Sequence, residues 1–478
     1  MRITTLALLG LGLSLVACRG GDGDDDSGGT PDGGPTIDSP PADVRIQDIQ
    51  SDAMAPGTVV SVKGVVVTAI DAFGSRAGDL FVQEPDGGER SGVKIFGAPL
   101  DQVAMLQVGD LVDIAGAAKE EFALSSDTSG RKVTELKPSG GGMTIKKVGT
   151  GAVPAPAIVD AVALSMMDKA AREAEWEKWE GVLITVVNAR QIAAQRSFGQ
   201  GPDQTEFRIT GVARVQSVLA ALPATNAFGV CYDRITGLGD YFFNDLVLPR
   251  STDDLVPGGT GCRPMATSVV AAQSTPNTEV VDLRNLVVTG RDDIGTNSKG
   301  FWVADALQAA PHNGVFVFTR DVSAPAEYVP GAVVNVQGAV TEFDLGSGGN
   351  PPTGDTLTQI VEPIHSLVSA PVGVPIPVVV TADVVSDIGA PGEAYEGVLV
   401  QVENLKVTNI NVGGGKVELT DNSGNKLIMD DDAFDWPDQV LNTCYAALTG
   451  IMSVQINDDV RTINPRALTD MIVGPGCN

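Results

Sequence analysis

Histidine is nearly absent from this sequence, and aromatic residues are few. The 478 residues include two histidines, His312 and His365, and only 5% Phe, Trp and Tyr. Catalysis by a serine or cysteine nucleophile needs an imidazole beside it, and the sequence around neither histidine indicates a nucleophile. The chain also lacks a His-x-x-x-His pair, a P-loop and a dinucleotide-binding glycine pattern. The sequence therefore predicts no catalytic site, no metal site and no cofactor.

Positive charge is also scarce. Lys and Arg number 32 against 60 Asp and Glu, which gives a net charge of −28 at pH 7. No stretch of the sequence carries a dense patch of Lys and Arg. Proteins that bind nucleic acid by neutralising phosphates need clustered positive charge. A nucleic-acid partner is therefore disfavoured.

The apolar run at the N-terminus is too short to span a membrane. Arg2 precedes this run over residues 6–13, whereas a membrane-spanning helix needs roughly 20 residues. The run is followed by Leu-Val-Ala-Cys, which ends at Cys18. Small residues before a cleavage point are typical of a signal peptide. The cysteine after Leu-x-Ala resembles the lipobox of bacterial lipoproteins.

This resemblance implies that residues 1–17 are a signal peptide and that Cys18 carries a diacylglycerol thioether and an N-acyl chain. More than one acyl chain makes membrane anchoring stable. Arg19 follows, whereas Asp at that position favours inner-membrane retention in enterobacterial lipoproteins, so we expect a lipid-anchored protein of the outer membrane, periplasmic or surface-exposed. Residues 18–42 are rich in Gly, Asp, Ser and Pro and should form a disordered tether. We interpret the acidic residues 22–26 as part of that solvated tether rather than as a calcium site.

The rest of the chain has the composition of short strands. Gly and Pro are plentiful, at 56 and 29 residues, and long segments with helical periodicity are scarce, which favours an all-β protein. Its length suggests two to four domains. Four cysteines remain besides Cys18, namely Cys231, Cys262, Cys444 and Cys477. An exported chain meets oxidising conditions, so we expect these four to form two disulfides.

An internal repeat selects the disulfide pairing. Cys-Tyr-x-x-x-Thr-Gly starts at Cys231 and at Cys444, and an aromatic-Glu-Gly-Val-Leu motif starts at Trp179 and at Tyr395. Two further blocks keep the same order, and all offsets lie between 213 and 222 residues. We interpret this as a tandem duplication, which pairs the first two cysteines with each other and the last two with each other. A bridge across about 30 residues contributes on the order of 3–4 kcal/mol. The chain has no Cys-x-x-Cys motif and no histidine near either pair, so these bridges are expected to be structural.

Each duplicated module divides into two halves of about five short strands. In the first half we expect strands near residues 59–69, 80–83, 92–96 and 108–116, because each is a short alternating run bounded by Gly, Pro or Asp. Such a set suits a small closed barrel. Residues 160–179 are strong helix formers before a Gly stop, so one short accessory helix is expected there. The predicted barrels cover residues 43–150, 151–263, 264–370 and 371–478.

The motif order resembles the OB-fold modules that precede the catalytic domain of bacterial extracellular nucleases. The resemblance covers most of residues 43–478, in two copies, and implies tandem OB-like β-barrels in two duplicated pairs. The nuclease domain, with its metal-binding carboxylates and catalytic histidine, has no counterpart before Asn478, so the resemblance implies no nuclease activity. The matching motifs are Asp-Ile-Gln at 48–50, Gly-Thr-Val-Val at 57–60, Phe-Val-Gln-Glu-Pro at 81–85, Val-Lys-Ile-Phe at 93–96, Val-Gly-Asp at 108–110, Thr-Glu-Leu at 134–136 and Glu-Gly at 180–181 and 396–397.

OB-folds bind ligands on the face of strands two and three, often through exposed aromatics. Alternation along a strand places Phe301 and Trp302 on opposite faces, and we expect Trp302 to be exposed. A core position is the alternative for each aromatic residue. The candidate ligand-face residues are Phe81, Lys94 and Phe96 in the first module, and Trp302, Phe316 and Phe318 in the second.

Two groups of neighbouring carboxylates remain. Residues 430–432 are three consecutive Asp, and residues 292–293 are two. Calcium prefers six to eight oxygen ligands, and neither group has the spaced pattern of a calcium loop. We interpret both groups as solvated turn residues.

These observations predict a lipid-anchored binding or scaffolding protein of the cell envelope without catalytic activity. Its partner would be a protein or a polysaccharide. One alternative is an accessory protein that captures extracellular DNA, which retention on DNA at low and moderate salt would test. Another is a metal-dependent hydrolase with an unrecognised carboxylate site, which a hydrolase screen with added divalent metals would test.

Overall fold

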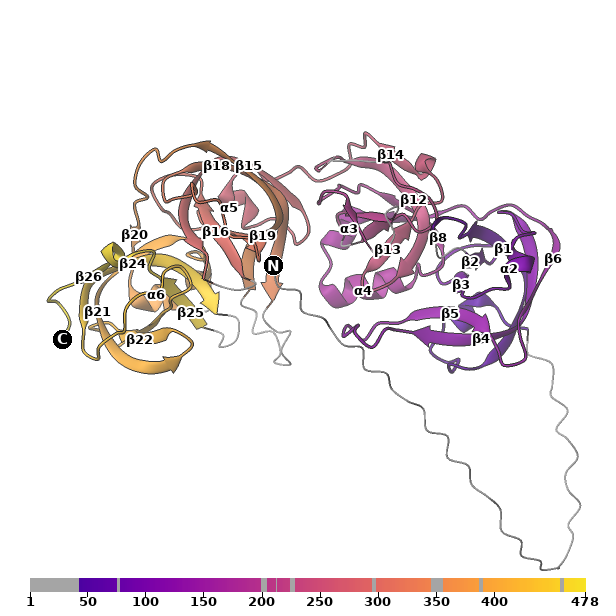
Figure 1. The fold of residues 1–478 in the computed structure, drawn as a ribbon, viewed down its shortest axis with the longest axis horizontal. Helices are drawn as coiled ribbons and strands as arrows, with labels where there is room; N and C mark the ends of the chain where they lie inside the picture. Colours follow the sequence, from indigo (N-terminus) through magenta and orange to yellow (C-terminus); the bar gives the residue numbers. More distant parts are fainter. Residues whose placement is uncertain are drawn as a thin grey trace, which may run out of the picture. The chain divides into compact units, whose positions relative to one another are not determined.

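The computed structural model describes residues 43–478 apart from residues 75–77, 199–203, 212, 224–227, 295–297, 345–355, 387–389 and 456–459 (Figure 1). The predicted signal peptide, the lipidated Cys18 and the tether lie outside the described residues. All described residues belong to one compact unit. None of the helices described has both the length and the apolar character that a membrane crossing requires.

The first barrel is a ring of five strands with the order 1-2-3-5-4, which is the OB-fold order. Its elements are α1 (Ile46–Ile49), β1 (Val59–Ile70), β2 (Leu80–Gln83), β3 (Gly92–Ile95), α2 (Leu100–Val103), β4 (Asp110–Phe122), β5 (Val133–Pro138) and β6 (Thr144–Thr150). Antiparallel pairs join β1 to β2 and β4, β2 to β3, and β4 to β5. A parallel pair of β3 and β5 closes the ring. β6 pairs with β4 outside it.

The second barrel follows the same path. Its elements are β7 (Ala157–Asp160), α3 (Ala161–Ser165), α4 (Lys169–Glu177), β8 (Leu183–Val187), β9 (Arg196–Ser197), β10 (Thr205–Arg208), β11 (Arg214–Gln216), β12 (Tyr232–Tyr241), β13 (Asp245–Leu248), η2 (Thr252–Asp254) and β14 (Leu255–Pro257). The order β8-β12-β13-β11-β10 matches the first ring, again with one parallel pair, β11 and β13. A bridge between Gln191 and Ile209 brings the chain after β8 to the end of β10.

The helix predicted over residues 160–179 is present but divided into α3 and α4. The Asp160 side chain accepts hydrogen bonds from the backbone N–H groups of Val162 and Ala163. The Asp168 side chain accepts one from Ala171 N at 2.8 Å. Aspartate is a preferred N-cap because its carboxylate satisfies free N–H groups of the first turn. The second cap therefore starts a new helix where helix propensity alone predicts a continuous one.

The third and fourth barrels repeat this topology. The third contains α5 (Val269–Ala272), β15 (Val280–Asp292), β16 (Lys299–Ala304), β17 (Val315–Arg320), β18 (Val333–Asp344) and β19 (Thr356–Ser369). The fourth contains β20 (Val378–Val379), α6 (Ala382–Ser386), α7 (Ala390–Glu393), β21 (Leu399–Gly413), β22 (Lys416–Thr420), β23 (Lys426–Met429), β24 (Cys444–Gln455), β25 (Val460–Asn464), η4 (Leu468–Asp470) and β26 (Met471–Val473). The third ring is closed. Within each ring of five strands one pair is parallel, β17–β19 in the third barrel and β23–β25 in the fourth. Outside the fourth ring, β20 also pairs in parallel with β21.

The structure confirms an all-β protein of tandem OB-like barrels. Alternation along each strand directs apolar side chains into the barrel, and four main cores result. Short helices that the sequence did not predict, α1, α2 and α5, lie beside the first and third barrels. We call the first two barrels the first module, and the last two the second module.

Both predicted disulfides are present. Cys231 is bonded to Cys262 and Cys444 to Cys477. Each bond links the start of the fourth ring strand, β12 or β24, to the chain beyond the short strand that pairs with it, β14 or β26. The repeat-based pairing is therefore confirmed.

Candidate functional site

The predicted ligand face of the first barrel is covered by the second barrel. Phe81 of β2 is 1% exposed and packs with Leu183, Leu238 and Leu248 of the second barrel. The Lys94 Nζ atom lies 3.5 Å from an Asp79 oxygen and 3.9 Å from an oxygen of Asp240, also in the second barrel. These two candidate residues therefore contribute to inter-barrel packing. Phe96, just after β3, is 49% exposed.

The third barrel repeats this arrangement, and the expected exposure of Trp302 is wrong. Alternation does place Phe301 in the barrel core and Trp302 on the outer face. The fourth barrel covers that outer face, so Trp302 is only 2% exposed. Its ring centroid lies 4.9 Å from that of Phe316, which is also buried. Phe318 is partly buried against the same cluster.

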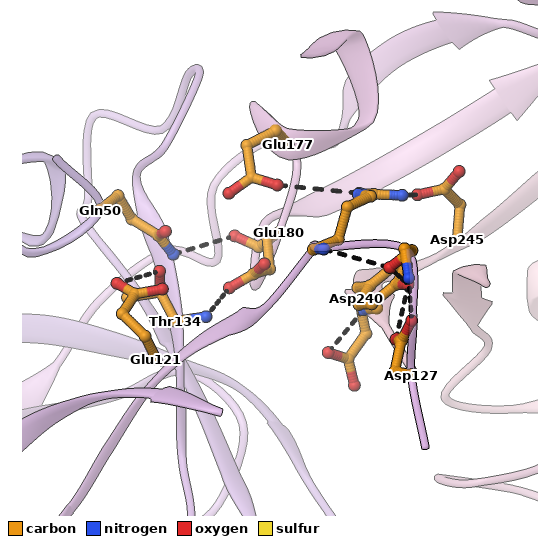
Figure 2. Close-up of polar contacts among 11 residues, drawn as sticks. Gln50, Glu121, Asp127, Thr134, Glu177, Glu180, Asp240 and Asp245 are labelled. Atoms are coloured by element: carbon orange, nitrogen blue, oxygen red, sulfur yellow. Dashed lines mark hydrogen bonds and ion pairs between the residues drawn. The ribbon is translucent and has the colours of Figure 1, made fainter. Parts of the chain in front are cut away.

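The duplicated Glu-Gly motif holds the two barrels of each module together. Glu180 accepts a hydrogen bond from Thr134 N of β5 at 2.6 Å, as Figure 2 shows. Glu396 accepts the equivalent bond from Thr358 N of β19 at 2.7 Å. Burial raises the pKa of both carboxyl groups well above the usual value. Burial in a low-dielectric environment disfavours the ionised form of each carboxyl group.

The glycines of this motif allow direct backbone contact between the barrels. A Cβ atom on Gly92 of β3 would lie 2.0 Å from the carbonyl oxygen of Gly181. A Cβ atom on Gly314, next to β17, would lie 2.2 Å from the carbonyl oxygen of Gly397. Gly181 and Gly397 also have positive φ angles of 70° and 69°, which favour glycine. The motif that revealed the duplication in the sequence is thus a docking element.

The loop before β5 meets the turn between β12 and β13 beside this docking element (Figure 2). Arg131 of that loop forms ion pairs with Asp245 at 2.5 Å and with Glu177 of α4 at 3.7 Å. Its guanidinium carbon lies 4.1 Å from the ring centroid of Tyr241. The Tyr241 hydroxyl donates a hydrogen bond to Asp127 at 2.8 Å. One arginine therefore links both barrels and orients a tyrosine.

Burial raises the pKa of several carboxyl groups at this junction. The pKa of Asp245 is raised to about 6, although Arg131 opposes the effect of burial. Burial also raises the pKa of Glu135 on β5 to about 7 and raises that of Asp240. These groups hold their protons more tightly in the folded protein than in the unfolded chain.

We therefore expect the protein to be more stable in mild acid than at neutral pH. A raised folded-state pKa means that the folded state binds more protons, so the free energy of unfolding falls as pH rises from about 4 to about 7 and then levels off. Urea unfolding followed at about pH 5 and about pH 8 would measure this difference. The variant Glu135→Gln should show a shallower pH dependence. Equal urea midpoints at both pH values would contradict the expectation.

An exposed aromatic pair lies at the tip of the β12–β13 turn. Phe242 and Phe243 are each 42% exposed, and their rings meet edge to face with centroids 5.1 Å apart. Phe243 adopts a left-handed backbone with φ of 57°, which is uncommon for a bulky residue. Residues held in such conformations cluster at functional sites. The two rings border a small pocket that also includes Leu124 and Tyr241. Sequence analysis missed this pair, although two aromatics directly before Asn-Asp in a turn were a usable signal.

The remaining candidate groups lie elsewhere. His365 Nδ1 is 2.9 Å from the Tyr328 hydroxyl inside the third barrel, and His312 adopts a positive φ of 60° in a turn. Oxygens of Asp430, Asp431 and Asp432 lie within 4.8 Å of one another. The expectation that all three are solvated is wrong for Asp430, which directly follows the core strand β23 and is 1% exposed. The same expectation is wrong for Asp292, which is the last residue of β15 and 6% exposed. Asp430 differs from an ordinary turn carboxylate in its titration as well. Its pKa is raised to about 7, mainly by burial.

Comparisons with known proteins give only distant matches. No known protein family and no curated protein matches this chain. A solved structure described as "Structural mimicry for functional antagonism" matches at 11% identity and a TM-score of 0.22, over 44% of this chain and all of the other. A replication protein A heterotrimer bound to single-stranded DNA matches at 11% identity and 0.18, over 67% and 94%. The Ifi202 HINa domain with double-stranded DNA matches at 7% and 0.16, over 66% and 98%. Because these scores are low, the fold assignment depends on the strand order.

Proposed function

We propose that this chain is a non-catalytic binding protein held at the bacterial cell envelope by a lipid on Cys18, and that the aromatic pair at the β12–β13 turn contacts its ligand. The lipobox resemblance and the two disulfides support an exported, anchored protein. The partner is an envelope polysaccharide or protein. The acidic composition and the scarcity of histidine are the basis for proposing binding rather than nucleic-acid processing or catalysis.

One observation carries this proposal. The strand-two and strand-three faces of the first and third barrels are used for packing within each module. At the loops of the first module, by contrast, Phe242 and Phe243 remain exposed in the β12–β13 turn. The loop between strands four and five is a usual ligand-binding element of OB-folds. A few residues, many of them aromatic, commonly supply most of the energy of a binding surface.

The test is binding of the unlipidated mature chain, residues 19–478, to peptidoglycan sacculi, purified envelope polysaccharide and immobilised envelope proteins. We expect retention on one of these, and about a tenfold weaker affinity for Phe242→Ala/Phe243→Ala, because truncating two contact aromatics costs more than about 1.4 kcal/mol. Phe96→Ala is the control for loss of an exposed aromatic ring, since Phe96 is 49% exposed and follows β3 rather than belonging to the β12–β13 turn. Retention on none of the three, or equal binding by the double alanine variant, would contradict the proposal.

A DNA arm of the same experiment addresses the nucleic-acid alternative. Three arginines lie on the neighbouring strands β9, β10 and β11, namely Arg196, Arg208 and Arg214. Arg196 and Arg214 both bond to Glu206, and Arg208 lies 3.2 Å from an oxygen of Glu362. These carboxylates offset most of the positive charge, so we expect no retention on DNA at low or moderate salt. Salt-sensitive retention would favour the alternative, because phosphate contacts weaken as salt rises.

A further inference from the structure

The second module carries an uncharged apolar segment on its surface. Residues 363–382 contain no Asp, Glu, Lys or Arg, in a chain with a net charge of −28. Apolar side chains in this segment that are each at least 42% exposed are Ile364, Leu367, Val368, Val372, Val374, Ile376 and Val379. Exposed apolar residues that gather in one segment, rather than being scattered singly, are a feature of interaction sites.

Part of this segment is the free edge of a strand. The parallel pairing of β19 with β17 ends at Ile360. A register shift against β18 follows, and Glu362 has a positive φ of 49°. From Ile364 to Ser369 the strand stays paired with β18, and among the described residues no other strand pairs with its opposite edge. Alternate N–H and C=O groups of such an edge are open to another strand.

The first module has the same edge but protects it with charge. There β6 pairs with β4 in the equivalent register, and Lys146 and Lys147 lie opposite Asp113 and Val112. Lys147 also forms an ion pair with Asp110 at 2.6 Å. Lysine on an edge strand opposes pairing with another chain. In the second module, Ser366 and Leu367 occupy the positions that correspond to these two lysines, opposite Asn335 and Val334 of β18. No lysine therefore protects this edge at these positions.

We propose that two copies of this chain associate through the β19 edge over residues 364–369, by antiparallel pairing of this edge with its own copy. An antiparallel pair of identical edges is self-complementary, as a twofold dimer interface requires. The absence of charge favours a second copy over a basic partner, which would find no carboxylate in this segment. Two copies with a net charge of −28 repel each other over most of their surface, and this segment lets their backbones approach without opposing carboxylates.

The mass of the unlipidated mature chain in solution, residues 19–478, tests this proposal. Analytical ultracentrifugation over a wide concentration range should show a dimer. Ser366→Lys/Leu367→Lys copies the lysines of β6 and should abolish that dimer. Both side chains are exposed, so circular dichroism and thermal unfolding should remain unchanged. Val148→Lys places a lysine at the equivalent edge of the first module, where Val148 is also exposed, and should leave the dimer intact.

Two results would overturn the proposal. One is that the unsubstituted chain is a monomer at every concentration. The segment would then bind a different protein or a lipid surface. The other is a dimer that persists in the double lysine variant, which would place the contact elsewhere. Neither result depends on the aromatic turn, so this proposal and the proposed function can fail separately.

Discussion

Gly181→Ala is expected to force apart the two barrels of the first module and to lower the free energy of unfolding by about 4 kcal/mol. A left-handed backbone costs a non-glycine residue about 1–2 kcal/mol. The new Cβ atom would also lie 2.6 Å from the backbone nitrogen of Val93. The barrels cannot relieve this contact without losing the packing between them, which includes Phe81 and Leu238. Losses of this size require such a specific cause.

Gly64→Ala is the matched control for this variant. Gly64 has a similar φ of 64°, but a Cβ atom there would meet no atom within 4 Å. The loss in the free energy of unfolding of Gly64→Ala therefore measures backbone strain alone. The additional loss in Gly181→Ala measures the steric conflict between the two barrels. Gly92→Ala acts on the same contact, so the two substitutions combined should cost less than their sum. Additive costs, or equal costs for Gly64→Ala and Gly181→Ala, would show that this contact does not hold the module together.

Trp302→Ala should cost about 3–5 kcal/mol, the usual range for truncating a buried tryptophan. Trp302 lies between the third and fourth barrels, where it contacts Phe316 and belongs to the core cluster of the fourth barrel. We expect the loss to appear as a lower urea midpoint for the second module. The first module should unfold as before, because Trp302 belongs to none of its cores.

Trp302→Phe separates packing from hydrogen bonding at the same position. The indole Nε1 is buried and has no acceptor among the described residues. Removing a buried unsatisfied donor recovers about 1–3 kcal/mol, which offsets part of the smaller ring's packing loss. We therefore expect Trp302→Phe to change stability by less than about 1.5 kcal/mol. A large loss for phenylalanine would indicate that the indole nitrogen has a functional partner.

The fold was predictable from sequence because alternation and repetition are local signals. The strands expected at residues 59–69 and 80–83 correspond closely to β1 and β2. The order of the duplicated blocks was enough to pair Cys231 with Cys262. The break at Asp168 was not predicted, because a capping aspartate inside a helix-favouring segment changes the helix boundaries without changing the average propensity.

The candidate site was less predictable because it depends on contacts between barrels. Alternation correctly placed Trp302 on the outer face of its strand, but no local pattern shows that another barrel covers that face. The role of Glu180 was hidden for the same reason, since its partner Thr134 belongs to a different barrel. Phe242 and Phe243 lie in a turn, whereas the general OB-fold pattern indicates aromatics on the faces of strands two and three.

The placement of the disulfides implies that reducing conditions would act unequally along the chain. Each bond fastens strands of the second or the fourth barrel only. The first and third barrels contain no cysteine among their strands. A reducing agent should therefore destabilise the second and fourth barrels. Protease digestion after reduction should leave the first and third barrels as the more resistant fragments.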